Sequence, residues 1–135
     1  MAPRKKTRPW IPVPMRWEAA RFGEDGTRLR LAYVTNDGVP ADRADVAWHR
    51  SQLTITLSRM KTIVTHERLP AIYHCVELRL STDASDRELV DGASGEFAAL
   101  KRSRYFNDED LRNTERTWDM VFEPREFLEP REVGL

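Results

Sequence analysis

Segments in which apolar and polar residues alternate recur along the first two thirds of the chain. In the clearest of them, 52–58, Leu53, Ile55 and Leu57 alternate with polar residues, so their side chains project to one face of an extended backbone. This period of two is typical of a strand with one buried face. It predicts further strands over 28–34, 62–65, 71–80 and 117–122, and leaves 45–49 ambiguous.

A helical period replaces the alternation after residue 84. Ser85 and Glu88 have the spacing of a capping box, and apolar residues then recur at helical intervals, at Leu89, Ala93, Phe97 and Leu100. Basic residues close the stretch, where cations complement the helix dipole. The pattern predicts one principal helix over 85–102. It also predicts a helical turn within 16–22 and a short helix over 107–113.

Taken in chain order, these elements predict an α+β domain. The expected architecture is an antiparallel sheet of about four to six strands, with the principal helix of the C-terminal half packed on it and extended segments at both ends. A β-barrel or a sandwich braced by the one helix is the alternative.

Both ends of the chain differ in composition from the body. Residues 1–15 hold four prolines, which favour extended, polyproline-like backbone. Residues 123–135 contain the sequence E-P-R-E twice, each time followed by apolar residues. We therefore divide the chain into an extended basic arm (1–15), a single α+β domain (16–122) and an acidic tail (123–135).

Charge is segregated along the chain although the formal net charge is zero. Five basic residues and no acid precede Glu18, whereas nine acids stand against four bases from Asn107 onward. The two ends therefore carry +5 and −5. Such asymmetry indicates a binding surface or an assembly contact more than a chemical reaction.

The composition also indicates the cellular compartment in which we expect the protein. Cys75 is the sole cysteine, so no disulfide forms within a monomer. No apolar run follows the basic start, and none approaches the roughly 20 residues that span a bilayer, so we expect no signal peptide and no membrane span. The expected location is intracellular: cytoplasmic, or nuclear in a eukaryotic host.

Candidate metal ligands and catalytic groups are sparse. His49, His66, His74 and Cys75 show none of the spacings of zinc sites, and the adjacent His74 and Cys75 point to opposite faces of a strand. We interpret His74 as a core-facing histidine and Cys75 as a small buried apolar residue. No nucleophile motif, phosphate-binding loop or dinucleotide fingerprint occurs. We therefore expect no metal, no cofactor and no enzymatic activity.

The basic arm is the first candidate for a binding site. Lysine and arginine side chains on an extended segment neutralise phosphates and release counterions, which gives sequence-independent affinity for nucleic acid. A tryptophan beside them adds base stacking on a single strand. The predicted nucleic-acid-binding residues are Arg4, Lys5, Lys6, Arg8 and Trp10. A solvated arm without a partner, a nuclear import signal and an anionic-membrane contact are the alternatives.

The tail is the second candidate. Exposed ion pairs contribute only about 0–1 kcal/mol each, so a contact between tail and arm, within one chain or between copies, requires burial of apolar residues. The predicted partner-binding residues are two apolar anchor pairs, Phe127/Leu128 and Val133/Leu135. A further cationic cluster would extend the arm if the fold brought its members to one face: Lys101, Arg102, Arg104 and Tyr105 with Arg59, Lys61 and Arg68.

These features favour a non-enzymatic binding or assembly protein, such as a viral or phage structural or accessory component. Its expected partner is nucleic acid, bound without sequence preference, or other copies of the chain in a homo-oligomer. The alternative is a protein-binding adaptor or inhibitor that acts through a sheet edge or through the tail. A small enzyme with its site at the open face of the sheet is the third hypothesis.

Overall fold

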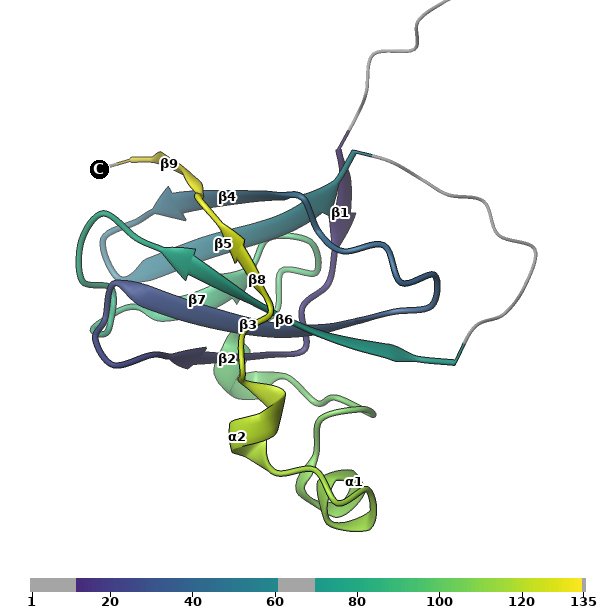
Figure 1. The fold of residues 1–135 in the computed structure, drawn as a ribbon. Coiled ribbons are helices and arrows are strands. Elements are labelled where there is room, and N and C mark those ends of the chain that lie inside the picture. Colours follow the sequence, from purple (N-terminus) through teal and green to yellow (C-terminus); the bar gives the residue numbers. More distant parts are fainter. Residues whose placement is uncertain (1–11, 61–69, 135) are drawn as a thin grey trace, which may run out of the picture.

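The computed structural model describes residues 12–60 and 70–134, and in these ranges the chain is built mostly of strands (Figure 1). The elements in chain order are β1 (Val13–Met15), β2 (Ala19–Phe22), β3 (Arg28–Thr35), β4 (Arg43–Trp48), β5 (Gln52–Arg59), β6 (Ile72–Arg79), β7 (Glu88–Asp91), the 3-10 turn η1 (Ala98–Leu100), α1 (Asp108–Asn113), α2 (Trp118–Val121), β8 (Glu126–Leu128) and β9 (Arg131–Val133). The α+β class predicted from the sequence fits this mixed, sheet-rich fold. The single sheet of about four to six strands does not, because nine strands of the described ranges divide into two sheets.

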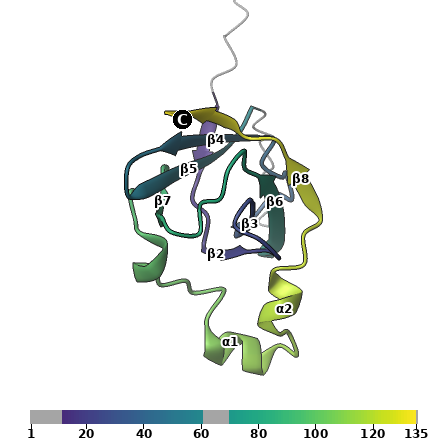
Figure 2. The same ribbon diagram turned by 90° about the vertical axis from the view of Figure 1, so that its left-hand side faces the viewer.

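The two sheets face each other and enclose the main core (Figure 2). Sheet A has the order β1-β5-β4-β9 with β7 also paired to β5, and sheet B has the order β2-β3-β6-β8. The strands β7, β8 and β9 join β5, β6 and β4 in parallel, whereas the other pairs are antiparallel. Side chains of the alternating segments fill the core, among them Leu29, Leu31, Val46, Leu53, Ile55, Leu57, Val76 and Leu78. The period of two in the sequence therefore identified the buried faces of β3, β5 and β6.

A second apolar cluster lies on the outer face of sheet B, beneath the segment that carries α1 and α2. Its buried members are Ala32, Cys75, Phe106, Leu111, Val121 and Phe122. Asn107 caps α1 by accepting the Asp110 N–H at 2.8 Å, so the short helix predicted at 107–113 is confirmed. The strand predicted at 117–122 is wrong, because Thr117 caps α2 in the same way. No helix of the described ranges is both long and apolar enough to cross a membrane.

The principal helix predicted over 85–102 is wrong. Residues 88–91 form β7 instead, and residues 98–100 form η1. Pairing with β5 outweighs the helical spacing, since Leu89 and Val90 lie in register with Leu53 and Thr54. Gly92 continues this close approach: a Cβ built on it would stand 1.8 Å from Thr56 Oγ1.

Two further expectations concern the start and the middle of the chain. The helical turn expected within 16–22 is wrong, because Ala19–Phe22 form β2 and pair with β3. The strand expected at 62–65 lies outside the described residues. The domain boundaries after residues 15 and 122 stay predictions, with β1, β8 and β9 pairing to strands of the 16–122 segment across them.

A buried ion pair joins three segments that are distant in sequence. Asp91 and Lys101 have side chains 0% and 2% exposed, with Lys101 Nζ 2.8 Å from Asp91 Oδ2. Asp91 also accepts the backbone N–H of Trp17 at 3.2 Å and of Ala93 at 2.9 Å. Lys101 donates to the carbonyl of Trp17 and lies 4.6 Å from the centroid of the indole ring. The pair therefore fixes the chain before β2 against the end of β7.

Replacement of Lys101 tests this ion pair. Lys101→Ala leaves the Asp91 carboxylate buried without its cation, and we expect it to lower the free energy of unfolding by about 3–5 kcal/mol. The measurement is denaturant unfolding of the variant against the unmodified chain. Arg104→Ala, which removes an exposed cation from the same segment, is the matched control and should change stability by less than about 0.5 kcal/mol. Equal losses for the two variants would contradict the assignment.

A partly exposed ion pair lies next to the buried one. Arg16 Nε donates to Glu96 Oε1 at 2.7 Å. The hydrogen bond from Arg16 is the main reason that the pKa of Glu96 falls from 4.5 to about 2. A lowered pKa means that the folded state favours the ionised carboxylate. This contribution to stability is complete above pH 4.5 and is lost as the pH falls toward 2.

Acid titration of stability tests the Arg16–Glu96 contact. Glu96→Gln removes the titrating group, so the stability advantage of the unmodified chain over this variant should shrink between pH 4.5 and 2. The measurement is the unfolding midpoint of both proteins across that pH range. Raising the salt concentration should reduce the difference at pH 7, since the pair is partly exposed. A difference that is constant with pH would show that Glu96 does not titrate with folding.

Candidate functional site

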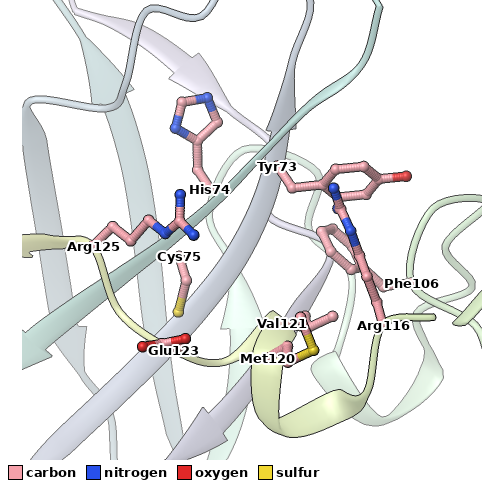
Figure 3. A pocket seen from close by; sticks show the side chains of 9 residues that line it. All are labelled: Tyr73, His74, Cys75, Phe106, Arg116, Met120, Val121, Glu123 and Arg125. Carbon is pink, nitrogen blue, oxygen red and sulfur yellow. The ribbon is translucent and has the colours of Figure 1, made fainter. Parts of the chain in front are cut away.

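A pocket of about 200 Å³ opens on the outer face of sheet B, between β6 and the α2 segment (Figure 3). Its lining comes from β6, from α2 and its flanks, and from the residues that lead into β8: Tyr73, His74, Cys75, Phe106, Arg116, Met120, Val121, Glu123 and Arg125. Residues 73–75, Phe106 and residues 116–125 are separate in sequence and meet because the helical segment crosses sheet B before the chain returns to its edge. The pocket is apolar at its base and charged at its rim.

Consecutive residues of β6 point in opposite directions at this pocket. Figure 3 shows Tyr73 and Cys75 on the pocket side and His74 on the far side, as the alternation in the sequence predicted. Cys75 is 3% exposed, and burial raises the pKa of its thiol to about 12. A thiol with so high a pKa carries almost no thiolate at neutral pH, so Cys75 contributes apolar surface and not a nucleophile.

Arginine and aromatic side chains form the rim. The guanidinium carbon of Arg116 lies 4.1 Å from the centroid of the Tyr73 ring, which is itself 37% exposed. Tyr73 packs edge-on against Phe106, with 5.2 Å between the ring centroids. Within the described residues, neither Arg116 nor Arg125 forms an ion pair. Two cations and a partly exposed ring around one pocket suit a ligand that combines negative charge with a flat surface.

On the far side of β6, His74 belongs to a hydrogen-bonded chain. Its Nε2 lies 2.8 Å from Thr35 Oγ1, and its Nδ1 lies 2.8 Å from Glu126 Oε2. The Tyr33 ring stacks on His74 at 4.8 Å, and its hydroxyl donates to Glu126. Burial and the Glu126 carboxylate raise the pKa of Tyr33 well above its ordinary value. A hydroxyl, an imidazole and a carboxylate follow one another here in the order of a nucleophile relay. Thr35, however, is buried and also accepts the N–H of Gly38. We therefore interpret this series of hydrogen bonds as one that holds β8 on sheet B.

The two E-P-R-E units place their second glutamates in equivalent surroundings. In the first unit, Glu126 accepts from Tyr33 and lies against His74. In the second, Glu132 Oε1 accepts from Trp48 Nε1 at 3.0 Å and from the backbone N–H and hydroxyl of Ser81 at 3.2 and 3.0 Å. Each unit thus forms one parallel edge strand, β8 on sheet B and β9 on sheet A.

The structure covers only part of the predicted site. Four arm cations and the arm tryptophan lie outside the described residues, as does the last tail residue: Arg4, Lys5, Lys6, Arg8, Trp10 and Leu135. Of the predicted anchors, Leu128 packs on the core, whereas Phe127 and Val133 are 67% and 63% exposed. The tail is held by its glutamates, which the sequence analysis missed although the repeat marks both.

Among the described residues, the members of the further cationic cluster considered around Lys101 do not gather on one face. Lys101 is buried against Asp91, and Arg59 lies 2.8 Å from Asp37 at the end of β5. Lys61 and Arg68 lie outside the described residues. Lys101 and Arg59 therefore belong to structural ion pairs, and of the cluster's described cations Arg102 and Arg104 are exposed.

Metal ligands and similarity to known proteins were also considered for this site. Among the described residues, no group of three or more histidine, cysteine, aspartate or glutamate side chains is placed to hold a metal ion. Comparison of the chain with protein-family models, with curated proteins and with solved structures gave no match.

Thiol labelling tests the environment of Cys75. We expect a thiol-specific reagent to react slowly with the folded chain at pH 8 and fully once the chain is unfolded, because burial raises the pKa of the thiol to about 12. Val133→Cys supplies a control, since its added cysteine occupies an exposed position and should react at once. Rapid, complete labelling of the unmodified folded chain would show that Cys75 is accessible.

Proposed function

We propose that the protein is a non-enzymatic binding protein that contacts single-stranded nucleic acid through its basic arm and the pocket beside Tyr73. The observation that carries the proposal is the rim of this pocket, where Arg116 lies over the partly exposed Tyr73 ring and Arg125 lines the same pocket. Phosphates are bound by cations, and any base stacks on an aromatic face, so such a surface favours a single strand without a sequence preference.

The position of the pocket also supports a shared surface with the arm. The described chain enters the fold at β1, where Val13 is the register partner of Arg59 at the end of β5. Tyr73 lies near the start of β6, and Figure 1 shows β1 and this end of β6 on the same side of the molecule. The ion pair between Arg59 and Asp37 ties the end of β5 to the turn after β3.

The length of the arm is compatible with this arrangement. Twelve residues of fully extended chain span at most about 40 Å, whereas stacked sheets lie about 10 Å apart. Arm cations and the rim of the pocket can therefore contact one strand of nucleic acid together. The arm supplies most of the charge, and the pocket supplies an aromatic surface and a fixed position.

Binding to a labelled single-stranded oligonucleotide of mixed sequence tests the proposal. By fluorescence anisotropy we expect affinity to fall linearly with the logarithm of salt concentration, with a slope of about 0.7 for each phosphate neutralised. Deletion of residues 1–9 should reduce both the affinity and the slope. Arg116→Gln should weaken binding and lower the slope by about 0.7, the share of one phosphate contact. Tyr73→Leu should weaken binding and leave the slope unchanged, because it removes stacking only.

Arg112→Gln is the matched control for the pocket. Arg112 is exposed on α1, so this variant makes the same change of charge on the same helical segment outside the pocket. Binding should be reduced less than in Arg116→Gln. Equal losses of affinity in the two variants would show that the pocket is not part of the binding site. An affinity that changes neither with salt concentration nor on deletion of residues 1–9 would overturn the proposal.

A further inference from the structure

The tail (residues 123–134 of the described chain) adds to the body of the domain (residues 16–122) as an extended peptide adds to the sheet edge of a receptor. β8 and β9 are three residues long each and add to the edges of β6 and β4 by parallel pairing. Strand addition of this kind supplies affinity through the backbone and specificity through side chains that enter pockets. Here the specific side chains are Glu126 and Glu132.

The body carries two receptor sites of the same type. Each contains an aromatic side chain that donates a hydrogen bond to the glutamate, Tyr33 through its hydroxyl and Trp48 through its indole N–H. Each has a second polar group, His74 on β6 and Ser81 after it. Both sites therefore select a carboxylate at the last position of E-P-R-E, and the tail presents two of them six residues apart in sequence.

The end of the tail is held as closely as its glutamates. Gly134 has a φ of +82°, and a Cβ built on it would stand 2.5 Å from the carbonyl oxygen of Trp48. Only glycine adopts this conformation at so short a distance without strain. The requirement for glycine shows that residues 126–134 fit one path along the two edges.

The docked tail leaves apolar surface uncovered. Phe127 and Val133 follow the two glutamates by one residue, so they face outward and are mostly exposed. Phe127 also lines an open cavity of about 270 Å³ with Arg28, Glu77 and Arg79. One exposed apolar side chain on each outer edge offers a contact to a neighbouring molecule.

We propose that residues 123–134 are a strand donor that a second copy of the chain takes up at its β6 and β4 edges. The contacts of the tail with the body are the same whether the tail belongs to that body or to another, so exchange conserves every hydrogen bond described above. The hinge is the connection between α2 and β8, where Pro124 prevents continuation of the helix. Reciprocal exchange closes a dimer, and one-way exchange links copies in a row.

Crosslinking between register partners tests the exchange with the full chain. Ala47 on β4 and Val133 on β9 are paired in the sheet, at a separation that suits a disulfide. Two single variants, Ala47→Cys and Val133→Cys, are mixed at low and at high protein concentration and then oxidised, with an affinity tag on one of them. Exchange predicts a disulfide-linked heterodimer whose yield rises with concentration and with time of mixing. Cys75 does not compete, because it is buried and its pKa is raised to about 12.

The controls separate exchange from chance collision. Val133→Cys mixed with Glu109→Cys, whose cysteine is exposed on α1 away from the tail, should give a lower yield. Adding Glu132→Gln to the Val133→Cys chain should also lower the yield, since it removes the carboxylate that Trp48 and Ser81 bind. Equal yields for matched and mismatched pairs, or a double variant Ala47→Cys/Val133→Cys that closes solely within monomers at every concentration, would overturn the proposal. No nucleic acid is present, so this result is independent of the binding test above.

Discussion

Burial of one carboxylate, that of Asp91, constrains much of the fold. A charge without solvent requires a partner and further hydrogen bonds, and here the partner is Lys101, with backbone donors from Trp17 and Ala93. These demands bring the segment between β1 and β2, the end of β7 and the residues after η1 to one point. Trp17 then fills the core and donates its indole N–H to the carbonyl of Ile55 at 3.0 Å.

Hydrogen-bonded acidic side chains also hold β8 and β9 in place. β8 and β9 are too short to be stable through their backbone pairing alone, and most of their apolar surface faces outward. Glu126 and Glu132 compensate by accepting hydrogen bonds from groups already fixed in the two sheets. Buried or partly buried acids therefore fasten the segment before β2 and the strands β8 and β9, which explains how a sheet-rich body with few helices incorporates them.

Local patterns predicted the strands that have one buried face, however distant their partner strands are in sequence. The alternation in 28–34, 52–58 and 71–80 identified β3, β5 and β6, since a period of two reports one buried face whatever the partner strand. The helix over 85–102 failed because pairing with β5, more than 30 residues earlier, decides the conformation of β7. The pocket was missed for the same reason: Tyr73, Arg116 and Arg125 come from separate elements. The repeat does mark Glu126 and Glu132, but its apolar residues were the predicted anchors, because burial of a glutamate depends on donors that only the folded sheets supply.

Completion of both sheets by β8 and β9 has a consequence for synthesis of the chain. Until residues 126–133 have left the ribosome, the outer edges of β6 and β4 have no strand beside them. Bare edges pair readily with other extended chains, so the nascent protein is exposed to that side reaction until these two strands have been made. A break in the chain before residue 126 would make this temporary condition permanent on both sheets at once.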